Sequence, residues 1–122
     1  MILGIDQLKH RLTRIHDGLG FEMGIALYEE AKIDLTEAIK RTPEKTGELK
    51  RSGKLGEILI RAKTVAVDIS FGGDTAPYAV YVHEDFAAFH PKGQAKFLES
   101  VLLESAPFMA ERLARRIDLA KL

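Results

Sequence analysis

The sequence contains no cysteine among its 122 residues. Without thiols, disulfide bonds and thiolate metal sites are excluded. No apolar run approaches the length of about 18 residues that a membrane-spanning helix requires. The first residues also lack the charged-then-apolar layout of a signal peptide. We therefore expect a protein that stays in the cytosol or in an assembly built there.

The chain also lacks an excess of charge of either sign. Its 18 basic and 18 acidic side chains give a formal net charge of zero. A dedicated nucleic-acid-binding protein usually carries a marked basic excess, so this balance weighs against that class. With 46% hydrophobic and 30% charged residues, the composition is that of an ordinary globular protein. The length predicts a single domain over residues 1–122.

Motifs for catalysis are missing as well. The sequence has neither the Gly-x-Ser-x-Gly motif of a serine nucleophile nor a Gly-x-x-x-x-Gly-Lys-Ser/Thr phosphate loop. The strongest polar cluster is His83-Glu84-Asp85 with His90, and a metal-dependent hydrolase built on His83, Glu84 and His90 is one alternative. Its spacing matches no established zinc pattern, and strand alternation would place His83 and Glu84 on opposite faces. We therefore predict no enzymatic activity, no metal and no cofactor.

Within this neutral chain the charges are segregated into two neighbouring segments. Residues 22–37 hold five acids against one base, and residues 40–54 hold six bases against two acids. Two solvated faces would explain this pattern, and so would two complementary surfaces that meet between subunits. The residues proposed for these surfaces are Glu29, Glu30 and Asp34 in the acidic segment, and Lys45, Lys50, Arg51 and Lys54 in the basic one.

The first third of the chain carries one apolar stripe at helical spacing, which begins with Leu8 and Leu12. This stripe predicts a helix from Ile5 to Lys40, with a break near Asp17–Gly20 because of the glycines there. Residues 1–17 would then form an arm that packs on a neighbouring subunit. Thr42-Pro43 should end the helix, and residues 42–56 should form an extended, mobile loop.

Two strands are predicted over residues 58–62 and 65–71, joined at Lys63-Thr64, and a third over residues 78–83. A second helical pattern begins at Gln94. Pro107 either kinks that helix or lies in the first turn of a further helix capped by Ser105. The predicted fold class is α+β, with a long N-terminal helix, a three-stranded antiparallel sheet and a C-terminal helix.

Three short stretches serve neither catalysis nor an obvious core. They are Thr-Gly-Glu-Leu-Lys-Arg-Ser at 46–52, Tyr-Ala-Val-Tyr-Val-His-Glu at 78–84, and Lys-Phe-Leu at 96–98. In this order and spacing they resemble a family of long-tailed bacteriophage proteins, the minor capsid, neck or tail-completion proteins of the head–tail junction. The resemblance covers about residues 42–105. The chain departs from the family pattern at three places: His83 is inserted before the glutamate, Asp85-Phe86 replaces Gly-Thr, and Lys96 replaces proline.

The resemblance implies a virion structural protein that assembles as a ring-shaped homo-oligomer. Its partners would be portal, adaptor or tail-tube proteins, and packaged DNA could contact the basic segment. Its location would be the virion, and the host cytoplasm during assembly. A nucleic-acid-binding module that uses residues 40–54 is the alternative function. The interface residues expected beyond the acidic segment are Tyr81, His83, Glu84, Phe86 and Phe89.

Overall fold

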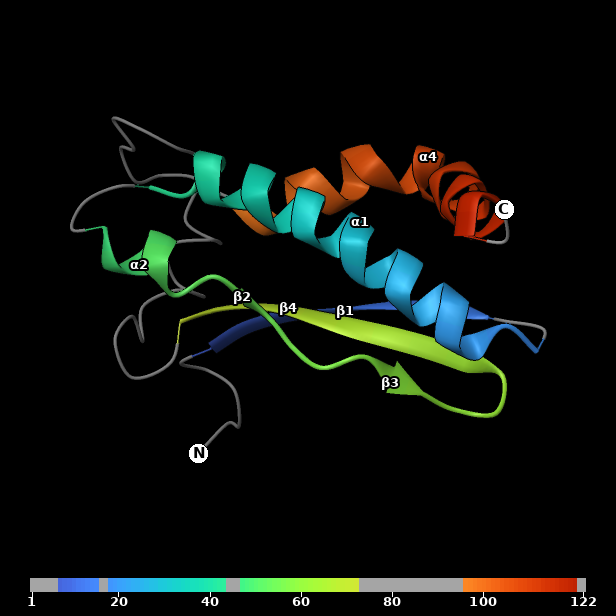
Figure 1. Cartoon of the computed structure of the whole chain (residues 1–122). Coiled ribbons are helices and arrows are strands. Elements are labelled where there is room, and N and C mark those ends of the chain that lie inside the picture. Colours follow the sequence, from blue (N-terminus) through green and yellow to red (C-terminus); the bar gives the residue numbers. More distant parts are fainter. Residues whose placement is uncertain (1–6, 16–17, 44–46, 73–95, 121–122) are drawn as a thin grey trace.

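The computed structural model describes residues 7–15, 18–43, 47–72 and 96–120, and Figure 1 shows their arrangement. Helices α1 and α4 lie side by side and cover one face of an antiparallel sheet (Figure 1). The predicted α+β class, with one long helix in the N-terminal part of the chain and one in the C-terminal part, is therefore confirmed. In chain order the elements are β1 (Gln7–Ile15), α1 (Gly20–Arg41), α2 (Glu48–Arg51), β2 (Lys54–Leu55), β3 (Leu59–Ile60), β4 (Thr64–Gly72) and α4 (Phe97–Ala120).

Strand β4 is the centre of the sheet, which has four strands among the described residues. On one edge β4 pairs with β1 along its whole length, from Gln7 opposite Gly72 to Ile15 opposite Thr64. On the other edge it pairs with the short strands β2 and β3, again antiparallel. The Arg61 amide donates to the Thr64 carbonyl over 2.8 Å, so the turn predicted at residues 63–64 closes the β3–β4 hairpin.

The helix predicted over residues 5–17 is wrong for residues 7–15, which form β1. Leu8 and Leu12 suit a helical stripe, but they equally lie on one face of a strand because they are an even number of residues apart. The buried strand β4 has backbone groups on both edges, and each edge needs hydrogen-bonding partners. Residues 7–15 supply the hydrogen-bonding partners for one of these edges. Their conformation is therefore decided by pairing with a strand that is distant in the sequence. The break predicted before the long helix is confirmed, since α1 begins at Gly20.

The core lies between the sheet and the helices. Alternate residues of β4 face the helical layer, and four of them have no exposed surface, namely Val65, Val67, Ile69 and Phe71. The Phe71 ring meets the Phe97 ring of α4 edge-to-face, with 5.1 Å between the ring centres. Aromatic pairs in this geometry add to the energy of apolar burial, so the contact fixes the start of α4 on the sheet.

The loop predicted to be extended over residues 42–56 contains α2 and β2, so that prediction is wrong for residues 48–51 and 54–55. Gly47 takes the left-handed conformation (φ 80°) that lets the chain turn into α2. Leu49 is 3% exposed and anchors α2 in the core. The Ser52 hydroxyl donates to the Leu49 carbonyl (2.6 Å) and accepts from the Gly72 amide (2.9 Å). These contacts tie the segment to the end of β4.

Helix α4 continues through Pro107 as one element, so Ser105 does not cap a further helix. The sheet has four described strands instead of the predicted three, because β1 and β2 were not foreseen. The strand predicted over residues 78–83 lies outside the described residues.

Candidate binding groove between α1 and α4

Charged side chains line the contact between the two long helices. Near the end of α1, the Arg41 guanidinium donates to both carboxylate oxygens of Glu104 over 2.6 and 2.7 Å. Towards the other end, Arg116 of α4 donates to Glu30 over 2.5 Å. The order of these pairs shows that α1 and α4 run antiparallel. A seam of polar and charged side chains, which includes Glu30, Arg41, Glu104 and Arg116, therefore runs along the contact between the two helices.

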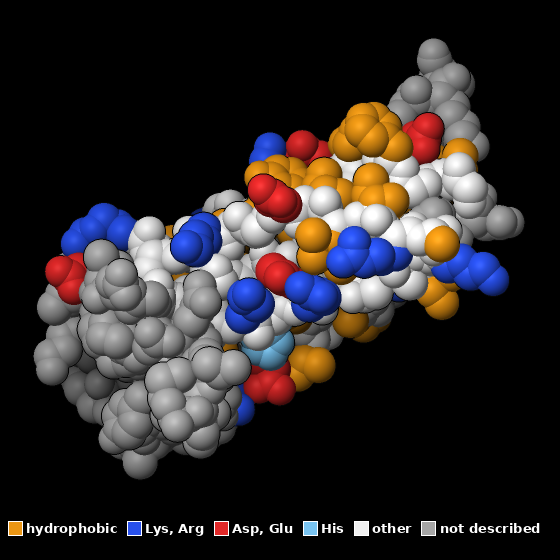
Figure 2. All heavy atoms as spheres, turned by 90° about the horizontal axis from the view of Figure 1, so that it is seen from below, with side chains coloured by type: hydrophobic (Ala, Val, Ile, Leu, Met, Phe, Trp, Pro, Cys, Tyr) orange, Lys and Arg blue, Asp and Glu red, His pale blue; other side chains and the backbone are white. Residues whose placement is uncertain are grey.

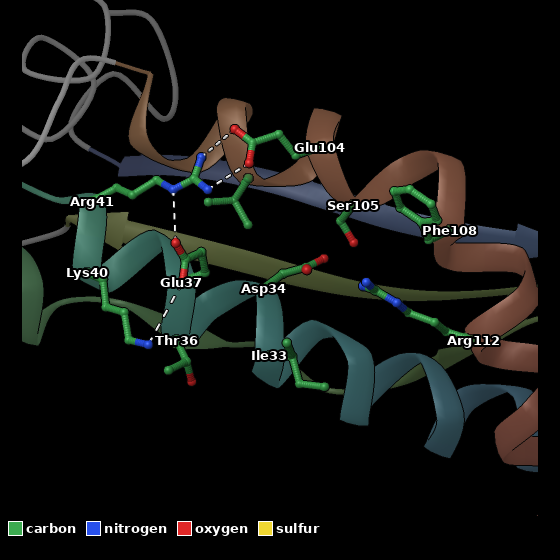
Figure 3. A pocket seen from close by; sticks show the side chains of 11 residues that line it. Ile33, Asp34, Thr36, Glu37, Lys40, Arg41, Glu104, Ser105, Phe108 and Arg112 are labelled. Carbon is green, nitrogen blue, oxygen red and sulfur yellow. Dashed lines mark hydrogen bonds and ion pairs between the residues drawn. The ribbon is translucent and has the colours of Figure 1, made fainter.

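A groove of about 450 Å³ opens along this seam. The Arg41–Glu104 pair lies at one end, and Arg112 reaches in from α4 (Figure 3). Ile33 of α1 and Phe108 of α4 contribute apolar surface, and they are 50% and 53% exposed. The groove therefore combines apolar walls with charged ends.

Asp34 and Ser105 lie at the floor of the groove. They are 3% and 8% exposed, and their side chains point toward one another from α1 and α4 (Figure 3). Neither Asp34 Oδ2 nor Ser105 Oγ has a hydrogen-bond partner within the described part of the chain. A buried carboxylate oxygen without a donor is uncommon, because burial removes the water that would otherwise satisfy it.

Burial raises the pKa of Asp34 to about 6, because desolvation disfavours the charged carboxylate. The nearby Ser105 hydroxyl opposes this change in pKa without reaching the geometry of a hydrogen bond. The negative charge of Glu30 raises the pKa further, and the positive charge of Arg112 lowers it. Near neutral pH the floor therefore presents a largely ionised carboxylate, and its Oδ2 atom has no donor among the described residues.

Arg112 does not form an ion pair with Asp34 in the structure. Its guanidinium lies over the Phe108 ring, 5.7 Å from the ring centre. One of its nitrogens is 3.9 Å from Glu30, whose side chain is 4% exposed. These two contacts hold the guanidinium beside the carboxylate of Asp34, within reach of its charge.

The solvent-facing acidic surface predicted on α1 is wrong for Glu30 and Asp34, each of which is 3% exposed. Both point to α4, because that helix supplies arginines to the same seam. Glu29 does lie at the surface, where Lys32 approaches it to 3.3 Å. The remaining acidic surface of α1 is therefore smaller than the charge count suggested.

The basic surface is smaller too. The Lys50 ammonium donates to the Ile39 carbonyl near the end of α1 over 2.8 Å, so it closes the α1–α2 corner. Arg51 on α2 and Lys54 on β2 are exposed to solvent. Lys45 lies outside the described residues.

On the sheet face that points away from the helices, basic and acidic side chains gather beside apolar ones (Figure 2). Asp68 accepts two hydrogen bonds from Arg11, its direct partner in the β1–β4 register, over 2.7 and 3.1 Å. The Lys9 ammonium is 4.0 Å from the same carboxylate. The Arg11 guanidinium holds the pKa of Asp68 below its usual value. This face therefore carries charges that neutralise one another locally.

Five predicted interface residues lie outside the described part of the chain, as do both histidines of the alternative metal site. Where the structure describes the chain, no three His, Asp or Glu side chains come together as a metal site would require. Its described helices are each too short or too polar to cross a membrane. The residues outside the described ranges are Tyr81, His83, Glu84, Phe86, Phe89 and His90.

Sequence reasoning missed Ser105, Phe108 and Arg112 as parts of one site. The available signal was the spacing on α1, where Glu30 and Asp34 are four residues apart and so share one helix face. Two acids on the face that packs against another helix require partners there. Which α4 residues face them depends on the register between the helices, and the sequence does not state that register.

A comparison with known proteins identified no relative of this chain. No protein-family model, no curated protein and no solved structure matches this chain.

Proposed function

We propose that this chain is a structural protein of a long-tailed phage virion, acting as a ring-forming subunit at the head–tail junction as a neck or tail-completion protein. The observation that carries the proposal is the ordered set of three motifs at residues 46–52, 78–84 and 96–98. No single motif is long, and their combination is what supports the assignment.

The described motif residues occupy positions that the fold restricts. Gly47 needs its left-handed backbone, Leu49 is buried, and Ser52 joins α2 to the end of β4. Phe97 and Leu98, at the start of α4, have no exposed surface. A shared pattern at such positions supports a shared fold, because each residue type meets a specific geometric need.

The surfaces support an assembly role. A subunit of a closed ring needs two different surfaces that fit each other, since the contact is head-to-tail. This chain presents a groove on the helical layer and exposed cations on α2 and β2. Exposed ion pairs contribute little affinity, so such charges would mainly set orientation and association rate.

Immunogold labelling tests the location. Antibodies raised against the purified full chain would be applied to particles from cells that express the gene in its native setting. We expect gold particles at the neck, between head and tail. Label confined to the tail tip or to the capsid faces would contradict the junction role.

A second measurement addresses the nucleic-acid alternative. The purified chain would be titrated with duplex DNA at several salt concentrations, because phosphate contacts weaken steeply as salt rises. We expect no binding at physiological salt. Tight, salt-dependent binding to free DNA would favour the nucleic-acid-binding module and would place Arg51 and Lys54 on phosphates.

A further inference from the structure

The carboxylates at the contact between α1 and α4 differ in whether they have a hydrogen-bond donor. Glu104 and Glu37 both accept from Arg41, and Glu30 accepts from Arg116. Asp34 is the seam carboxylate whose buried oxygen has no donor in the described chain. It lies beside a second unpartnered group, Ser105 Oγ, on the floor of an open groove. A buried carboxylate oxygen and a hydroxyl that can also accept both line this cavity, and the pair suits a ligand that donates hydrogen bonds.

We propose that the groove between α1 and α4 binds an arginine side chain presented by a partner protein. The guanidinium would donate to Asp34 and Ser105, and its aliphatic stem would lie between Ile33 and Phe108. The identity of the partner as a neighbouring subunit or another junction protein rests on the proposed function. The chemistry of the groove does not depend on it.

The shape and polarity of the groove favour arginine. A guanidinium carries several donors in one plane, so it can serve a carboxylate and a hydroxyl together, and it stacks on aromatic rings. Phe108 remains 53% exposed even with Arg112 over its ring, which leaves aromatic surface for a second group. A cavity of about 450 Å³ has room for a side chain of this size.

The nearest cation of the chain itself is held in other contacts. Arg112 lies over Phe108 and approaches Glu30 to 3.9 Å, and it forms no ion pair with Asp34. Its charge helps to keep the Asp34 carboxylate ionised, which favours a donor from outside. The floor of the groove therefore favours a cation, and Arg112 does not occupy that position as an ion-pair partner of Asp34.

The test is a titration of the full chain with N-acetyl-arginine amide, followed by two-dimensional NMR. N-acetyl-citrulline amide is the matched probe, because it has the same shape without the charge. We expect shifts clustered at residues 33–37 and 104–112 with the arginine probe, and smaller ones with citrulline. Shifts scattered over exposed acids, or equal for both probes, would overturn the proposal.

Variants identify the groups responsible. Asp34→Asn should weaken binding of the arginine probe at least about tenfold, since a hydrogen bond to a charged group is lost. Glu57→Gln, a change at an exposed carboxylate elsewhere, should leave the affinity unchanged. Equal effects of the two variants would mean that the probe responds only to net charge, and the proposal would fail.

Arg112→Ala separates an external ligand from an internal one. If the groove binds a partner's arginine, this variant should bind the probe at least as well as the wild type. Binding by the variant alone would show that Arg112 fills the site in solution, and that result would overturn the proposal. The titration needs no virion protein, so its failure and a failure of the neck labelling are separate results.

Discussion

Glu30 and Asp34 show how two buried acids one helical turn apart can differ in energy. Both are 3% exposed, but the Arg116 guanidinium donates to a carboxylate oxygen of Glu30 over 2.5 Å, whereas Asp34 Oδ2 has no donor in the part of the chain that the structure describes. Burying a carboxylate costs several kcal/mol unless donors replace the lost water. The burial of Asp34 therefore lowers the stability of the free chain, as is common for groups placed to bind something else.

The pH dependence of stability should show this cost. Between pH 3.8 and about 6 the folded chain retains a proton on Asp34 that the unfolded chain has released. The free energy of unfolding should therefore fall as pH rises through this interval. At about 1.36 kcal/mol for each unit of pKa, the loss is roughly 2–3 kcal/mol. Urea denaturation of the wild type and of Asp34→Asn measures it.

Asp34→Asn should remove this part of the pH profile and should be the more stable protein at pH 7.5. The matched control is Glu57→Gln, whose carboxylate is exposed and which should keep the wild-type profile. Parallel pH profiles for the wild type and Asp34→Asn would contradict a raised pKa at Asp34.

At the scale of elements, the sequence predicted most of what local pattern controls. The alternation from Val65 to Phe71 identified β4, and the glycines around Gly20 located the start of α1. Residues 7–15 could not be assigned in this way, because Leu8 and Leu12 fit a helix and a strand equally well. Their state is decided by the free edge of β4, about fifty residues further along the chain. The groove was missed for a similar reason, since the α1–α4 register brings Asp34 to Ser105.

Two matched substitutions test whether residues 7–15 pack as a strand. Leu8 is 7% exposed in the core, and Ile15, at the end of the same strand, is 79% exposed. Leu8→Ala should lower the free energy of unfolding by about 2–3 kcal/mol, and Ile15→Ala by less than about 0.5 kcal/mol. Denaturant unfolding gives both values. Equal, small effects would restore the idea of a loose N-terminal arm.

Neighbouring arginines of α4 test the seam. Arg116→Ala leaves the Glu30 carboxylate without its closest donor and should destabilise the chain by about 2–4 kcal/mol. Arg115 pairs at the surface with Glu111, where both side chains are about 70% exposed, so Arg115→Ala should cost less than about 0.5 kcal/mol. Thermal unfolding at pH 7.5 distinguishes the two. Similar costs would mean that Glu30 is hydrated in solution.

In the whole molecule, β4 is the element to which every other described strand attaches. Its face towards the helices has no exposed side chains from Val65 to Phe71. We expect native-state hydrogen exchange to be slowest for the amides of β4, since opening them requires nearly global unfolding. Amides of the four-residue helix α2 should exchange faster. Faster exchange in β4 than in α2 would contradict this ranking.

The pairing of β1 with β4 also has a consequence during translation. Between 49 and 65 residues separate the paired positions, so β1 leaves the ribosome well before its partner exists. At about 5–20 residues per second, it waits roughly 2–13 s for β4. Lys9, Arg11 and Arg14 within β1 carry like charges that discourage the waiting segments of two nascent chains from pairing with each other. The same charges that line one edge of the finished sheet thus protect the unfinished chain on a polysome.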